Sequence, residues 1–89
     1  MSGWTVYILR CRDGTLYTGI AVDLQRRLAA HARGAAAKYT RGRLPVVLAY
    51  QEHQPDRASA LRREAALRRL GRLGKLALLG RLAPSPPPY

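Results

Sequence analysis

Arg27 and His31 are four residues apart, a spacing that places two side chains on the same face of a helix. The apolar stripe of that helix is formed by Leu24 and Leu28. A helix that only covered a core would carry apolar residues at positions 27 and 31 as well. We therefore expect a cation and an imidazole together at the rim of a cleft. The alternative is that both side chains extend past the edge of the core into solvent.

Glu64 departs from a helical pattern in a second segment. At about 100° per residue it lies about 60° from Leu61, inside the apolar arc of that helix. It is the only acid in residues 57–89, which hold eight cations. A buried, unpaired carboxylate is costly, so Glu64 either pairs with an arginine, Arg68 or Arg27, or binds a metal ion at the bottom of a cleft. An oxygen ligand in a phosphate-binding protein favours Mg²⁺.

Aromatic residues accompany these charged groups. Residues 38–43 interleave three cations with Tyr39, and such a loop can hold phosphates while the ring stacks on a base or sugar. Tyr7 and Tyr17 lie on neighbouring strands of a predicted hairpin and can meet on one face of it. The simpler interpretation of these two tyrosines is packing.

The elements that must position these residues follow from local pattern. β-branched and aromatic residues predict a strand over 5–9, buried on both faces. The pair Asp13-Gly14 predicts a hairpin turn, and residues 16–20 form the returning strand. Asp23 is a good N-cap for a helix over 24–32 that ends at Gly34.

The second half of the chain predicts a loop over 35–45, a strand over 46–50 and a helix over 58–70. Gly71 and Gly74 predict a break before a short helix over 75–79. The order strand, strand, helix, strand, helix, helix predicts an α+β domain, with a small three-stranded antiparallel sheet and three flanking helices. We expect this domain to span residues 1–81 and a proline-rich, disordered tail to span 82–89.

Length and charge limit the possible functions. The chain has 89 residues and a net charge of +11, and all but two of its 16 cations are arginine. Such a charge predicts a polyanionic partner, above all nucleic acid, and arginine suits bidentate contact with phosphate. Cys11, the single cysteine, excludes an internal disulfide and is expected to be a buried apolar residue. No signal peptide or membrane span is evident, so we expect a cytoplasmic protein.

Taken in order, these motifs resemble the GIY-YIG nuclease domain, and most closely its small stand-alone bacterial members. The first motif is Thr5-Val6-Tyr7 and the second is Tyr17-Thr18-Gly19. Arg27, His31, the basic loop over 38–43 and Glu64 follow in the family's order. The resemblance covers residues 4–80.

The resemblance implies hydrolysis of a phosphodiester by in-line attack with one divalent metal. Glu64 would hold Mg²⁺ or Mn²⁺, and Arg27 would contact a non-bridging oxygen of the phosphate. Either Tyr7 or His31 would take the proton of the attacking water, a choice that the sequence leaves open. Tyr17 would position the water or phosphate. Gly19, together with the side chains of Lys38, Tyr39, Arg41 and Arg43, would contact the nucleic acid.

The chain also departs from the family's pattern. The first motif lacks the glycine and isoleucine of its name, and Ile20 stands where repair nucleases carry a lysine. Lys75 and Leu76 stand near the position where some members use an asparagine. We expect no second DNA-binding module, so target choice would depend on a homodimer or a protein partner.

Two functions are consistent with this pattern. The first is a metal-dependent endonuclease acting on DNA rather than RNA, on branched or single-stranded structures, in repair or recombination. The second is a non-catalytic module that binds nucleic acid through charge alone. An anionic-membrane binder is disfavoured, because no long helix with a clean apolar face is present.

Overall fold

The computed structural model describes residues 3–82, except for the side chains of residues 81 and 82. Three antiparallel strands form one sheet in the order β2-β1-β3. The strands are β1 (Trp4–Cys11), β2 (Leu16–Ala21) and β3 (Val46–Gln54). The helices are α1 (Leu24–Ala32), α2 (Lys38–Arg41), α3 (Arg57–Arg69) and α4 (Gly71–Leu82). The predicted α+β fold with a three-stranded antiparallel sheet is confirmed.

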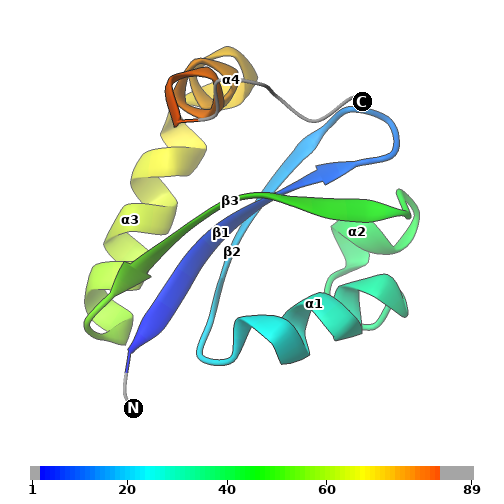
Figure 1. Ribbon diagram of the computed structural model, residues 1–89, viewed down its shortest axis with the longest axis horizontal. Coiled ribbons are helices and arrows are strands. Elements are labelled where there is room, and N and C mark those ends of the chain that lie inside the picture. Colours follow the sequence, from blue (N-terminus) through cyan, green and yellow to red (C-terminus); the bar gives the residue numbers. More distant parts are fainter. Residues whose placement is uncertain (1–2, 83–89) are drawn as a thin grey trace.

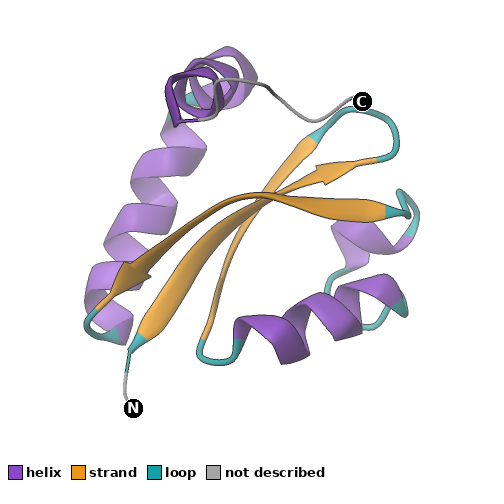
Figure 2. Cartoon of the chain, in the orientation of Figure 1, coloured by secondary structure: helices purple, strands orange, loops and turns teal. Residues whose placement is uncertain are grey.

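Helices cover both faces of this sheet. Figure 1 shows α3 and α4 on one side and α1 and α2 on the other, and Figure 2 shows the strands passing between these two layers. The central strand β1 is therefore buried on both faces, as its sequence predicts. Val6 and Ile8 contact the α3 side, where they pack against Ala60 and Leu67. Tyr7 points to the opposite face, toward α1.

Local sequence explains the hairpin and the helix that follows it. At the turn, Asp13 accepts hydrogen bonds from the Thr15 amide at 3.1 Å and the Thr15 hydroxyl at 2.6 Å, while Gly14 takes a φ of 85°. Asp23 caps α1 by accepting a hydrogen bond from the Arg26 amide at 3.1 Å. Gly34, with a φ of 74°, follows the end of α1. The predicted turn, cap and helix bounds are confirmed.

Three predicted elements need correction. The loop predicted over 35–45 contains the single-turn helix α2, so four helices flank the sheet in the described residues instead of three. The third strand continues from Tyr50 to Gln54, because its polar half still pairs with β1 and Arg63 binds Glu52 at 2.8 Å. The break is at Gly71 only.

Helix α4 runs through Gly74, where a Cβ would lie 2.7 Å from the Leu70 Cβ. Glycine at this position therefore permits a close approach and does not end the helix. Cys11 is buried as predicted, at 1% exposure. The predicted tail lies outside the described residues apart from Leu82, the last residue of α4. Among the described residues, no helix is both long enough and apolar enough to span a membrane.

Candidate active site

A buried chain of hydrogen bonds connects β1, α1 and α2. The Tyr7 hydroxyl lies 2.9 Å from His31 Nε2, and His31 Nδ1 lies 2.9 Å from Thr40 Oγ1. Each of these three residues is 0% exposed. The prediction that His31 lies with Arg27 at the rim of a cleft is therefore wrong for His31, whose imidazole faces Tyr7 beneath the surface.

The direction of each hydrogen bond follows from Thr40. Its hydroxyl donates its single proton to the Ala37 carbonyl at 3.2 Å, so it can only accept from His31 Nδ1. With the proton on Nδ1, the Nε2 of a neutral imidazole is an acceptor, and the Tyr7 hydroxyl donates to it. The fold thus holds His31 in one tautomer, with its basic nitrogen toward Tyr7.

Burial keeps both members of this pair neutral near pH 7. It raises the pKa of Tyr7 to about 12, with a further contribution from the neighbouring Tyr17 hydroxyl. Burial also lowers the pKa of His31 below its usual 6.5, and the positive charge of Arg27 acts in the same direction. The pair is therefore a phenol that retains its proton beside an imidazole that is free to accept one.

Arg27 approaches the same hydroxyl from solvent. It lies on the exposed side of α1, and both its charge and its hydrogen bond to Tyr7 lower the pKa of that phenol against the effect of burial. Arg27 also lines a cleft of about 440 Å³ with Arg26 and Arg33. Arg27 thus presents a cation both to this cleft and to the Tyr7 hydroxyl.

Gly19 makes room for the Tyr7 ring. Gly19 pairs with Tyr7 across the hairpin, so both face the α1 side of the sheet. A Cβ on Gly19 would lie 2.6 Å from the Tyr7 hydroxyl oxygen and 3.2 Å from Tyr17 Cε2. A side chain here would displace the hydroxyl. The glycine of the second motif is therefore required by the position of Tyr7.

Glu64 lies on α3, the helix on the other face of the sheet. Its Oε2 accepts a hydrogen bond from Arg68 Nη2 at 3.2 Å, and the same Nη2 lies 3.3 Å from the Thr18 carbonyl of the edge strand β2. The negative charge of Glu64 contributes to the raised pKa of Tyr7, so the two groups interact across β2. Of the alternatives left open, an ion pair with Arg68 is present in the structure.

The donor set at Glu64 fits a single hard cation completed by substrate. The Glu64 side chain is 17% exposed, and its Oε1 has no hydrogen-bond partner among the described residues. The described residues hold no group of three or more His, Cys, Asp or Glu side chains that could bind a metal. Mg²⁺ commonly binds one or two carboxylates and takes its other ligands from phosphate and water. Glu64 could hold such an ion.

Aromatic rings form the outer wall of the site. The Tyr17 ring packs edge-on against His31 with centroids 5.5 Å apart, and stacks on Tyr39 at 5.7 Å. The Arg43 guanidinium lies over the Tyr39 ring, 4.0 Å from its centroid, and forms an ion pair with Asp13 at 3.2 Å. Arg43 therefore fixes the loop, while Lys38 and Arg41 remain exposed.

The structure brings together Tyr7, Tyr17, Arg27, His31 and Gly19, with Glu64 across the edge strand. Thr40 belongs to the same network, although sequence reasoning gave it no role. Its only signal was a threonine among the cations of a predicted loop. Nothing in the spacing connects it to His31, which lies nine residues earlier on another helix.

Residues 3–76 match the family described as the GIY-YIG catalytic domain. The match covers most of the chain, so the protein belongs to this family of nuclease domains, whose substrate is nucleic acid. The resemblance predicted from the ordered motifs is confirmed.

Relatives of this chain include UPF0213 proteins. One from Streptococcus sanguinis is 53% identical over 60 residues, which are 67% of this chain and 69% of that protein. One from Halobacterium salinarum is 52% identical over 59 residues, which are 66% of this chain and 77% of that protein. The solution NMR structure of a UPF0213 protein from Bacillus halodurans is similar with a TM-score of 0.57 and 42% identity, over 90% of this chain and 84% of that one. The chain is thus similar to the small stand-alone members of the family.

Proposed function

We propose that this protein is a metal-dependent endonuclease that hydrolyses phosphodiester bonds in branched or single-stranded DNA by in-line attack with one metal ion. The observation that carries the proposal is the oriented chain from Tyr7 through His31 to Thr40, placed beside Arg27. Binding through charge alone does not require a buried imidazole held in one tautomer.

Proton removal from the attacking water would use both Tyr7 and His31. With a pKa of about 12, Tyr7 is too weakly ionised near pH 7 to act alone as a base. The Tyr7 oxygen can accept the proton of the water as its own proton moves to His31 Nε2. In this relay His31 is the general base, and Tyr7 contacts the water and transfers the proton to His31.

Charge on the phosphate would be met by Arg27 and Glu64. The Arg27 guanidinium can donate to a non-bridging oxygen, where negative charge increases in the transition state. Glu64 would hold Mg²⁺ or Mn²⁺, and when bound such an ion supplies Lewis acidity that stabilises the leaving oxygen. The strand would lie across the cleft that Arg26 and Arg33 line beside Arg27.

One observation favours the second candidate, a binding module without catalysis. Glu64 is already paired with Arg68, which satisfies its charge without a metal. The two candidates differ in what happens when that carboxylate is replaced by its neutral amide.

Glu64→Gln and Glu52→Gln test the proposal as a matched pair. Both glutamates pair with an arginine, and their side chains are 17% and 18% exposed, but Glu52 lies on β3, where its register partner on β1 is Val6 and not Tyr7. With labelled single-stranded, duplex and branched DNA in Mg²⁺, Mn²⁺ or EDTA, we expect metal-dependent cleavage that Glu64→Gln lowers by at least about 10²-fold and Glu52→Gln leaves intact. If all three proteins bind DNA and none of them cleaves it, the proposed enzymatic activity is refuted. The binding module without catalysis then remains.

A further inference from the structure

A second cleft opens along the outer edge of β2, between Tyr17 and Tyr39 on the α1–α2 side of the sheet and Arg68 and Lys75 on α3 and α4. Its volume is about 360 Å³, and its lining residues are Leu16, Tyr17, Thr18, Tyr39, Arg68 and Lys75. Tyr17 also packs against His31, so the cleft adjoins the candidate active site. The roles proposed above make no use of Thr18, Arg68 or Lys75.

Lys75 is the unusual residue of this cleft. It lies on α4 and is only 8% exposed, yet it forms no hydrogen bond or ion pair within the described residues. Lysine is almost never buried without a partner, because an ammonium group loses its hydration at a high free-energy cost. Burial and the nearby charge of Arg68 both lower the pKa of Lys75. The Lys75 ammonium is not among the fully buried, unsatisfied atoms of the described residues, so it reaches the cleft, where an anion would compensate for its partial loss of hydration.

Two other donors converge on the same cleft. Thr18 Oγ1 is the one buried side-chain polar atom of the described residues that lacks a hydrogen-bond partner. Arg68 is held over the edge of β2 by the Thr18 carbonyl and by Glu64, and its side chain stays 58% exposed. An ammonium, a hydroxyl and a guanidinium together suit an anion with several acceptor oxygens.

We propose that this cleft is a phosphate subsite, in which Lys75, Arg68 and Thr18 bind a backbone phosphate of the nucleic-acid strand next to the one at Tyr7. The inference deepens the proposed function by adding a second contact to the same strand. A strand is favoured over a free phosphate ion because the stacked rings of Tyr17 and Tyr39 line the cleft and can pack against a sugar or base. The net charge of +11 favours a polyanion too.

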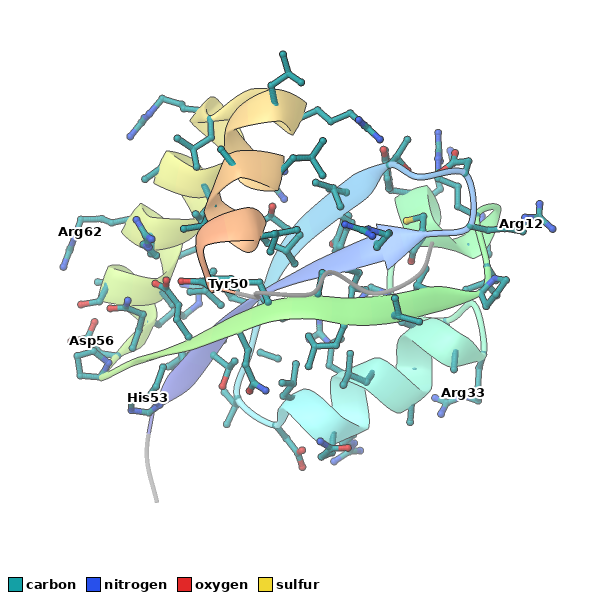
Figure 3. All side chains as sticks on the ribbon, turned by 45° about the horizontal axis from the view of Figure 1, so that its top comes forward. Arg12, Arg33, Tyr50, His53, Asp56 and Arg62 are labelled. Carbon is teal, nitrogen blue, oxygen red and sulfur yellow. The ribbon has the colours of Figure 1, made fainter. Side chains whose placement is uncertain are left out.

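Lys75→Met and Arg62→Met test the subsite as a matched pair. Each removes one positive charge, but Arg62 lies on the outer side of α3, pointing away from the sheet (Figure 3), and donates a hydrogen bond to Ser59. The measurement is the fluorescence anisotropy of a labelled single-stranded DNA 12-mer at a series of salt concentrations. EDTA is present, so that no metal-dependent cleavage occurs.

We expect Lys75→Met to weaken binding about fivefold or more and to reduce the slope of log affinity against log salt by about one. Arg62→Met should change affinity by less than about twofold. Equal losses in the two variants would show a general effect of charge and would overturn the subsite.

Thermal unfolding provides a second readout with the opposite sign. Without ligand, Lys75→Met should raise the Tm, because it removes a mostly buried cation that lies near the charge of Arg68 and has no ion pair within the described residues. A lowered Tm would show that Lys75 supports the fold, which would overturn the inference. If inorganic phosphate raised the Tm of the unchanged protein as much as the 12-mer did, and Lys75→Met abolished that rise, the strand assignment would be overturned in favour of a free-phosphate site.

The subsite and the nuclease can fail separately. Cleavage by the unchanged protein, together with unimpaired 12-mer binding by Lys75→Met, keeps the nuclease and refutes the subsite. Binding that depends on Lys75, without any cleavage, refutes the nuclease and supports the subsite.

Discussion

The two faces of the central strand bury their residues for different purposes. Val6 and Ile8 point to the α3 side and belong to an apolar cluster that includes Ala60 and Leu67. Tyr7, one residue away, points to the α1 side and meets an imidazole there. Both faces are fully buried, so solvent exclusion alone does not distinguish a core from a site.

The difference is one of hydrogen bonding. On the α3 side, apolar burial stabilises the domain, and contacts there are interchangeable within limits of volume. On the α1 side, the side chains of Tyr7, His31 and Thr40 are joined by hydrogen bonds. Removal of one of these polar groups leaves its partner unsatisfied. The first face should therefore respond to mutation through stability, and the second through chemistry.

Tyr7→Phe should produce the largest effect. It removes the hydroxyl that would contact the water and leaves the ring in place, so cleavage should fall about 10²- to 10⁴-fold, while DNA affinity changes little. Single-turnover rates and binding in EDTA measure the two quantities. If Tyr7→Phe cleaves at the normal rate, the proposed proton relay is refuted. The proposed functional difference between the two faces of β1 is then refuted too.

Leu67→Ala tests the apolar face. Leu67 is 0% exposed in the core cluster with Val6 and Ile8, so its truncation should lower the free energy of unfolding by about 2–5 kcal/mol. Urea denaturation measures this loss. Well below the Tm, the cleavage rate per folded molecule should stay within about threefold of normal. A collapse of the rate in folded protein would show that the faces are coupled.

Gly19→Ala tests the contact between the strands on the site face. The added methyl group would overlap the Tyr7 hydroxyl, so the ring must shift, and both stability (by about 1–3 kcal/mol) and cleavage should fall. Gly42→Ala is the control, since a Cβ there meets nothing within 4 Å. Equal behaviour of the two variants in unfolding and cleavage assays would argue against a requirement for glycine at position 19.

Thr40→Val and Thr40→Ser test whether Thr40 positions His31. Valine keeps the shape and removes the acceptor for Nδ1–H, so cleavage should fall about tenfold or more, because the imidazole loses the hydrogen bond that fixes its tautomer. Serine should restore it. The ¹⁵N shifts of the His31 ring should show Nδ1 protonated in the unchanged protein and in Thr40→Ser, and mixed tautomers in Thr40→Val. The same tautomer in all three proteins would exclude this role.

The pH dependence should be the mildest effect. The pKa of His31 is lowered in the folded protein, so the base stays neutral down to a pH below 6.5, and the cleavage rate should decline only beneath that value. The unfolded chain binds this proton more readily, so the contribution of His31 to stability is complete above pH 6.5 and is lost as the pH falls further. Rate and urea profiles in His53→Gln, which retains His31, should match those of the unchanged protein. A rate that declines from pH 8 downward would contradict a lowered pKa.

Much of the fold was predictable because its signals are local. Asp23, Gly14 and Gly34 act through their immediate neighbours, and the bounds of α1 follow from them. The polar half of β3 was missed, because its pairing with β1 depends on a distant strand and not on its own residues. Gly74 was misassigned for a similar reason, since a glycine within a helix and one that ends a helix have the same local sequence.

The sequence by itself determined which groups are available for chemistry, the order of the elements and the faces on which most of these groups lie, because side-chain periodicity in helices and strands is a local property. Only the tertiary structure decided that His31 is buried, that Thr40 fixes its tautomer, that Glu64 pairs with Arg68 and that Lys75 has no ion pair within the described residues. Desolvation and hydrogen-bond direction depend on which distant segments close over a side chain, and these exist only once the helices have packed on both faces of the sheet.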